Sequence, residues 1–138
     1  MSLVDYSELE QEIENAPEPK ILKVGSEVLA RIILVNTGVS EKNGCKWYNI
    51  TFDVPEDPLV KEFRYFFWEL DREHLDEKQY SRNLYSFKLL IKCFGIDISR
   101  PFNWEEDLLG KEGWVILGVK KDDGFGEQNQ INKFVAGC

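Results

Sequence analysis

Aromatic side chains are concentrated on two stretches of the sequence, residues 47–54 and 61–70, and lysine or arginine lies beside the first stretch and within the second. Exposed aromatic rings can stack on unpaired bases, and each stacked base contributes ~1 to 3 kcal/mol of binding free energy. Lysine and arginine side chains near such rings neutralise phosphate groups. This combination predicts a surface that binds single-stranded nucleic acid with little sequence preference. The candidate residues are Arg31, Lys42, Lys46, Trp47, Asn49, Arg64, Phe66, Trp68, Lys120, Lys121 and Phe125.

The direction in which these rings point follows from strand alternation, because successive side chains of a strand lie on opposite faces. Apolar residues occupy every second position of 48–54, and Glu62 with Arg64 mark the polar side of the next stretch. The residues expected to face outward are Trp47, Asn49, Arg64, Phe66 and Trp68. A competing interpretation is that a small domain needs any one of these rings in its core, since both faces of a strand can be apolar.

Catalytic and metal-binding patterns are missing from the sequence. The single histidine, His74, lies among acidic residues that are typical of a solvated helix start. No nucleophile elbow, phosphate loop, zinc motif or calcium loop is present, and Gly110-Lys111 lacks the rest of a phosphate loop. Residues 105–107 are acidic, but their spacing favours a helix start or surface loop over a cation site. We therefore expect no enzyme activity, no metal and no cofactor.

The cysteines and the hydropathy pattern indicate a cellular compartment. Cys45, Cys93 and Cys138 are odd in number and far apart, so neither a disulfide framework nor a zinc site is expected. No apolar run approaches the roughly 20 residues that a membrane span needs, and the N-terminus does not resemble a signal peptide. We expect a soluble protein of a reducing compartment, the cytoplasm.

The formal charge of −8 is unevenly distributed. Residues 1–19 contain six acidic residues and no basic one, so the other residues hold 19 acidic against 17 basic side chains. Within this acidic arm, Tyr6, Leu9 and Ile13 recur at helical spacing. The arm is expected to be either a solvated tail, which would compete with DNA for basic loops, or a helix that docks on the domain or on a second subunit. We divide the chain into an arm, residues 1–20, and a domain, residues 21–138.

The domain is expected to contain a helix among strands. Apolar residues recur at steps of three and four from Tyr80 to Phe94, including Leu84, which predicts an amphipathic helix ended by Gly95. Asn43-Gly44 predicts a two-residue type I′ hairpin turn, and the glycines near Asp123 predict a second hairpin. The expected strands, from their period of two, are residues 24–35, 47–54, 61–70, 114–121 and 129–136.

This order of elements favours one architecture. Three strands, a helix and a closing hairpin make the order of the OB-fold, a five-stranded Greek-key barrel with a helix between strands three and four. A ferredoxin-like fold needs a helix after its first strand, and an immunoglobulin-like sandwich has no central helix. The predicted fold class is therefore mainly β. In such a barrel, strands two and three and the loops beside them bind oligonucleotides.

Short motifs along most of the chain also suggest a family. They are Val4-Asp5-Tyr6, Gly25-Ser26-Glu27-Val28, Lys42-Asn43-Gly44, Leu109-Gly110-Lys111, Val115, Phe125-Gly126 and Asn129 to Ile131. Together they resemble a family of small bacteriophage and prophage proteins regarded as single-stranded DNA-binding OB-fold proteins of recombination or replication modules. The aromatic stretch 63–68 is richer than the family pattern.

The resemblance implies a protein that coats and protects single-stranded DNA during replication or recombination. It also implies that the acidic arm recruits replication or recombination proteins. The alternative is a module of OB-like fold whose aromatic face binds another protein, because exposed aromatic residues also mark protein interfaces. Low overall basicity favours this alternative, whereas the lysines beside Trp47 favour DNA. The sequence does not determine the oligomeric state.

Overall fold

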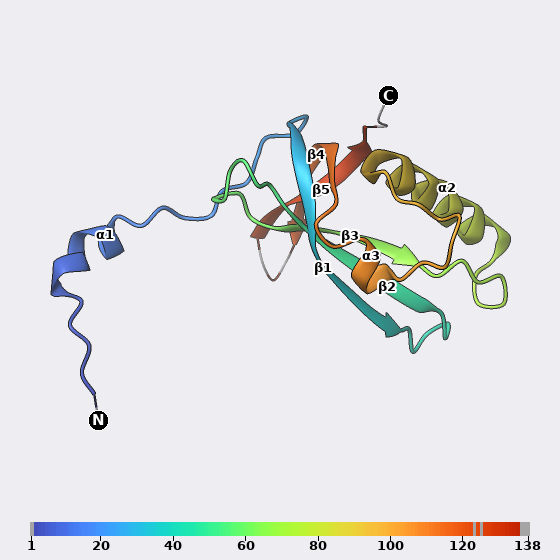
Figure 1. The fold of residues 1–138 in the computed structure, drawn as a ribbon, viewed down its shortest axis with the longest axis horizontal. Helices are drawn as coiled ribbons and strands as arrows, with labels where there is room; N and C mark the ends of the chain where they lie inside the picture. Colours follow the sequence, from blue (N-terminus) through green and yellow to red (C-terminus); the bar gives the residue numbers. More distant parts are fainter. Residues whose placement is uncertain (1, 123, 125, 136–138) are drawn as a thin grey trace.

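A computed structural model describes residues 2–122, 124 and 126–135, and it is mainly β (Figure 1). The strands are β1 (Glu27–Val39), β2 (Lys46–Asp53), β3 (Phe63–Trp68), β4 (Glu112–Asp122) and β5 (Gly126–Phe134). The helices are η1 (Ser7–Leu9), α1 (Glu10–Glu14), α2 (Glu77–Phe94) and α3 (Trp104–Asp107). The predicted order of three strands, a long helix and a closing hairpin is confirmed, and the short α3 is additional.

The strands form one antiparallel sheet in the order β3-β2-β1-β4-β5. β1 is central because its first half pairs with β4 and its second half with β2, and the register shifts between Ile32 and Leu34. A bulge of this kind bends a strand and lets a sheet curl. The two outer strands come close enough for the rings of Tyr65 and Phe134 to lie 5.0 Å apart. The sheet is therefore barrel-like.

The core is built from the inward-facing side chains of this curled sheet. Ile32, Ile50, Phe52 and Phe67 are fully buried, and Phe63 is 2% exposed. These residues alternate with more exposed ones along β1, β2 and β3, as a sheet with one covered face requires. The predicted alternation is confirmed for the third strand and for most of the second, where Thr51, on the opposite side from Ile50 and Phe52, is also buried at 1% exposed.

Helix α2 closes part of the core. Asp76 caps its first turn, accepting a hydrogen bond from the backbone N–H of Gln79 at 2.7 Å, and Gly95 ends it with a φ of +64°. Its buried residues are Leu90 and Phe94. The predicted helix and its glycine cap are confirmed, but the predicted apolar stripe is not wholly core. Leu84 stays 44% exposed, and the two buried residues of the helix both lie in its C-terminal half.

The loop between β1 and β2 differs from its prediction. A type I′ turn needs positive φ at both central residues, but no described non-glycine residue has one, and only Gly44 of the pair does. β1 ends at Val39 and β2 begins at Lys46, so residues 40–45 form a loop longer than the predicted two-residue turn. The backbone N–H of Ser40 donates to the carbonyl of Cys45, and that of Gly44 donates to the carbonyl of Ser40. Cys45, the last residue of this loop, is fully buried.

The acidic arm extends away from the barrel (Figure 1). Its described residues from Ser2 to Pro19 are all exposed, including Tyr6, Leu9 and Ile13 of the predicted apolar stripe. The chain joins the barrel at Lys20, which forms a parallel bridge with Val60. Within the described ranges, no helix is long and apolar enough to cross a membrane.

Candidate nucleic-acid interface

The outer face of β1, β2 and β3 is organised in rows of directly paired residues, which share a face of the sheet. The row nearest the β1–β2 loop is Gly38, Trp47 and Trp68. The next rows are Asn36, Asn49 and Phe66, then Leu34, Thr51 and Arg64. Register therefore brings five candidate residues from β2 and β3 onto one surface, which we call the outer face.

Three aromatic rings gather at one end of the outer face. The centroids of Trp47 and Phe66 lie 5.9 Å apart, and Phe66 meets Trp68 edge to face at 4.9 Å. Phe66 is 46% exposed, while the two tryptophans are half-buried. The predicted outward direction of all three rings is confirmed. The cluster offers ring faces at the surface and is partly held by its own contacts.

Two residues that the sequence analysis did not identify fix the tryptophans. Gly38 lies so close to the indole of Trp47 that a Cβ atom there would be 2.4 Å from Cζ2. Asn83 on α2 holds the backbone of Trp68, accepting a hydrogen bond from its N–H at 3.0 Å and donating one to its carbonyl. A glycine inside a long strand is a signal of close approach, so Gly38 could have been found. Asn83 carries no such signal.

The basic candidates are distributed differently from the prediction. The guanidinium of Arg31 binds both carboxylate oxygens of Asp53, at 3.1 and 2.6 Å, and this pairing raises the pKa of Arg31. Its charge is therefore already compensated. Lys46, expected beside Trp47, lies on the opposite face, where its amine is 5.4 Å from the ring centroid of Tyr48. That prediction is wrong because adjacent residues of a strand point to opposite sides.

The other basic candidates are exposed. Lys42 lies in the β1–β2 loop, and Lys120 and Lys121 lie near the end of β4. β4 pairs antiparallel with the first residues of β1, with Ile116 opposite Glu27, and then continues past the start of β1. Lys120 and Lys121 therefore lie at the opposite end of β1 from Gly38. Phe125 lies outside the described residues. The structure thus gathers Trp47, Asn49, Arg64, Phe66 and Trp68, and leaves Lys42 in the β1–β2 loop and Lys120 and Lys121 near the end of β4.

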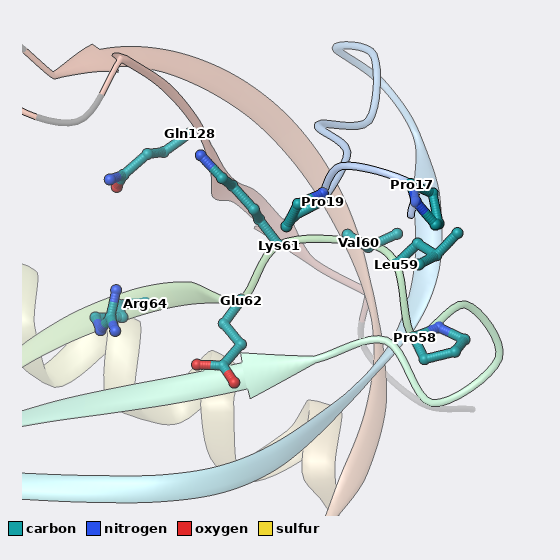
Figure 2. Close-up of a pocket in the computed structure, with 9 residues that line it drawn as sticks. All are labelled: Pro17, Pro19, Pro58, Leu59, Val60, Lys61, Glu62, Arg64 and Gln128. Atoms are coloured by element: carbon teal, nitrogen blue, oxygen red, sulfur yellow. The ribbon is translucent and has the colours of Figure 1, made fainter. Parts of the chain in front are cut away.

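Arg64 continues the outer face toward a pocket of about 490 Å³ (Figure 2). Lys61, Arg64 and Gln128 lie around one side of this pocket, and Pro17, Pro19 and Pro58 lie around the other. Both Lys61 and Arg64 are exposed. Arg64 on β3 and Lys61 just before the strand therefore place two positive groups beside the outer face, with the exposed carboxylate of Glu62 between them in the sequence. The sequence analysis did not name Lys61 or Gln128.

A second group of aromatic rings lies on the inner side of the sheet and is structural. Tyr48 stacks on Trp104 of α3 at 4.1 Å with an angle of 9° between the ring planes. Burial and a hydrogen bond to the Glu69 carboxylate raise the pKa of the Tyr48 hydroxyl. α3 is capped by Asn103, which accepts hydrogen bonds from the N–H groups of Glu105 and Glu106. The helix start expected at residues 105–107 is confirmed.

Among the described residues, one group has the composition of a metal site. Asp71, Glu73 and His74 bring ligand atoms within 4.8 Å of one another. Asp71 already accepts a hydrogen bond from the backbone N–H of Glu73 and contacts Nδ1 of His74 at 2.5 Å. These contacts, led by that of His74, lower the pKa of Asp71. The grouping is thus explained by the loop's own bonds, and we assign it no metal.

The comparisons with known proteins add no family to this geometry. No protein-family model matches the chain, and neither does any curated protein sequence.

Proposed function

We propose that the protein is a non-enzymatic single-stranded DNA-binding protein with an OB-fold. The fold proposal is supported by the strand order β3-β2-β1-β4-β5 and by the approach of β3 to β5 through Tyr65 and Phe134. It is supported also by the position of α2 between β3 and β4 in the chain. These are features of a five-stranded barrel closed between its third and fifth strands.

The observation that carries the binding proposal is the ring cluster of Trp47, Phe66 and Trp68 on the outer face. Buried rings would serve the core, but Phe66 is 46% exposed and the core has its own rings on the other side of the sheet. Bases stack on such rings whatever their identity, and a duplex hides those bases in its own stack. The protein therefore prefers single strands and reads little sequence.

Charge along β3 supplies the phosphate contacts. Along β3, moving away from the β1–β2 loop, the outer face presents Trp68, then Phe66, then Arg64. Lys61 lies farther along, at the adjoining pocket. Neither residue has the compensation that Asp53 gives Arg31. A strand that stacks on the rings and continues along β3 would pass these two cations, and Lys42 lies in the loop at the other end. Binding by a few cations weakens as salt rises.

A second function is favoured by one observation, the neutralisation of Arg31 by Asp53. It leaves the centre of the outer face less basic than a nucleic-acid groove usually is. The same ring cluster could then bind an apolar segment of another protein. A role in phage-type replication or recombination, within the host cytoplasm, rests on the sequence resemblance alone and is part of the proposal.

Anisotropy of a labelled single-stranded oligonucleotide tests the proposal. Phe66→Ala should weaken binding about five- to a hundredfold, the equivalent of one lost stack of ~1 to 3 kcal/mol. Trp114→Ala is the matched control, because Trp114 is an exposed ring, at 47%, on β4 outside the outer face. Equal affinities of the two variants, or absence of binding by the unaltered protein, would leave the protein-interaction function instead.

A further inference from the structure

Helix α2 carries an apolar groove on the side that does not face the core. Leu84, Tyr85, Ile91 and Ile98 line it, and Lys88 and Lys92 lie among them, around a volume of about 640 Å³. Leu84, Tyr85 and Ile98 are 44%, 60% and 53% exposed. We call this surface the α2 groove. Apolar side chains gathered on one exposed surface mark an interaction site.

The charge around the α2 groove is positive. Lys88 and Lys92 line it, and α2 as a whole contains four basic residues against the single acid Glu77. This is an unusual concentration in a chain of net charge −8. A segment that fills the groove should therefore combine apolar side chains with several acidic ones.

The acidic arm of this chain has that composition. Tyr6, Leu9 and Ile13 are 59%, 44% and 58% exposed on η1 and α1, and six acidic residues accompany them without a basic one. The arm and the groove thus each expose an apolar stripe, with charges of opposite sign beside it. Burying both stripes removes apolar surface from water, and the opposite charges fix the orientation.

We propose that the arm of one copy of this chain docks in the α2 groove of a second copy, and that the exchange is reciprocal. The arm joins the barrel at Lys20 beside Val60, before β3, whereas the groove opens at Leu70 and Ile98, after β3. Figure 1 shows the arm and α2 on opposite sides of the barrel. The seven residues from Ile13 to Lys20 span at most about 25 Å when fully extended, which favours the groove of a second copy over that of the same copy.

The proposal does not depend on DNA binding, and it is tested by the mass of the protein in solution. Sedimentation equilibrium of the full chain should give a dimer. Lys88→Glu with Lys92→Glu should weaken the dimer at least tenfold, and adding Glu10→Lys with Glu12→Lys to the same chain should restore it. Lys23→Glu with Lys133→Glu makes the same charge change outside the groove and should leave the dimer intact.

Two further variants test the proposal even if the charge-reversed protein does not fold. Leu84→Asn changes an exposed residue, so the circular dichroism spectrum should be unchanged while the dimer is weakened. Removal of residues 1–19 should give a folded monomer, because the described contacts of the barrel begin at Lys20. A monomeric unaltered protein, or a dimer that survives both the arm deletion and the charge reversal, overturns the proposal. The proposal is also overturned if the protein is a monomer in which the arm slows proteolysis around the α2 groove of the same copy.

Discussion

The indole ring of Trp47 occupies the space that a side chain at Gly38 would fill, since a Cβ atom on Gly38 would lie 2.4 Å from its Cζ2 atom. Gly38 and Trp47 are directly paired across β1 and β2, in the row that Trp68 completes on β3. The glycine thus sets how the first ring of the cluster lies. This relationship makes the position of a proposed binding ring depend on a residue that itself offers no binding group.

Gly38→Ala should therefore weaken binding of single-stranded DNA without removing any ring or charge. The new methyl group must displace the indole, because real Cβ contacts under 3.0 Å essentially never occur. Gly118→Ala is the matched control, since its Cβ would meet the side chain of Asn132 on β5 instead of a ring of the cluster. Titration of an oligonucleotide into each variant makes the comparison. Equal affinities would show that the orientation of Trp47 has no part in binding.

Stacking and charge should be separable by salt. Trp47→Ala should lower affinity by ~1 to 3 kcal/mol at every salt concentration, because stacking is little screened. Arg64→Gln should instead reduce the slope of log affinity against log salt by about 0.7, the value for one phosphate contact on a single strand. Lys133→Gln on β5 serves as the charge control. The assignment of Arg64 to phosphate fails if its variant keeps the original slope.

Loss of the inner ring Trp104 should affect stability and leave binding unchanged. Trp104 stacks on Tyr48 and also lies 5.2 Å from Phe87 on α2, so it joins α3 to the helix and the sheet. Trp104→Ala should lower the free energy of unfolding by about 3 kcal/mol, the low end of the range for large core rings, because Trp104 is only partly buried against the core. Urea denaturation gives this value, and DNA affinity is measured well below the midpoint. A loss of affinity by the folded variant would contradict the separation of inner and outer rings.

The Asp71 carboxylate should stabilise the fold in a pH-dependent way. Its pKa in the folded protein is lowered, first by the contact with His74 and then by the N–H of Glu73, from an ordinary value of 3.8. A lowered pKa means that the contribution is present above the ordinary pKa and is lost as the pH falls through the folded-state value. Asp71→Asn should lower the melting temperature at pH 5 to 7, with a difference that shrinks below about pH 4. A difference that is constant from pH 7 to pH 2 would contradict this assignment.

The sequence predicted the sheet well because strand alternation is a local signal. Trp47 could be placed on the outer face because apolar residues occupy every second position of β2, and Phe66 and Trp68 because Arg64 marks the polar side of an otherwise aromatic β3. The β1–β2 turn was predicted wrongly from Asn43-Gly44, since the length of a hairpin loop depends on where the pairing of the two strands stops. Here pairing stops at Val39 and Lys46, so the loop has six residues instead of the two of a tight turn.

The parts of the site that the sequence could not supply depend on contacts between distant residues. The pairing of Arg31 with Asp53, 22 residues away, removes a cation that seemed free. The hydrogen bond between Asn83 and Trp68 joins α2 to the end of β3, and no local sequence pattern predicts it. Leu84 fitted the helical period, yet only packing decides which apolar residues of a helix reach the core. For the same reason, the sequence alone did not decide whether the acidic arm stays solvated or docks on the domain or on a second subunit.

The central claim is that the ring cluster of Trp47, Phe66 and Trp68 binds unpaired bases. It is tested most directly by titrating the protein with a single-stranded oligonucleotide and with a duplex of the same length at the same salt, following tryptophan fluorescence. We expect tighter binding of the single strand with quenching of the tryptophan signal, because only unpaired bases can stack on the rings. Equal or tighter binding of the duplex, or binding of the single strand without quenching, would contradict the claim.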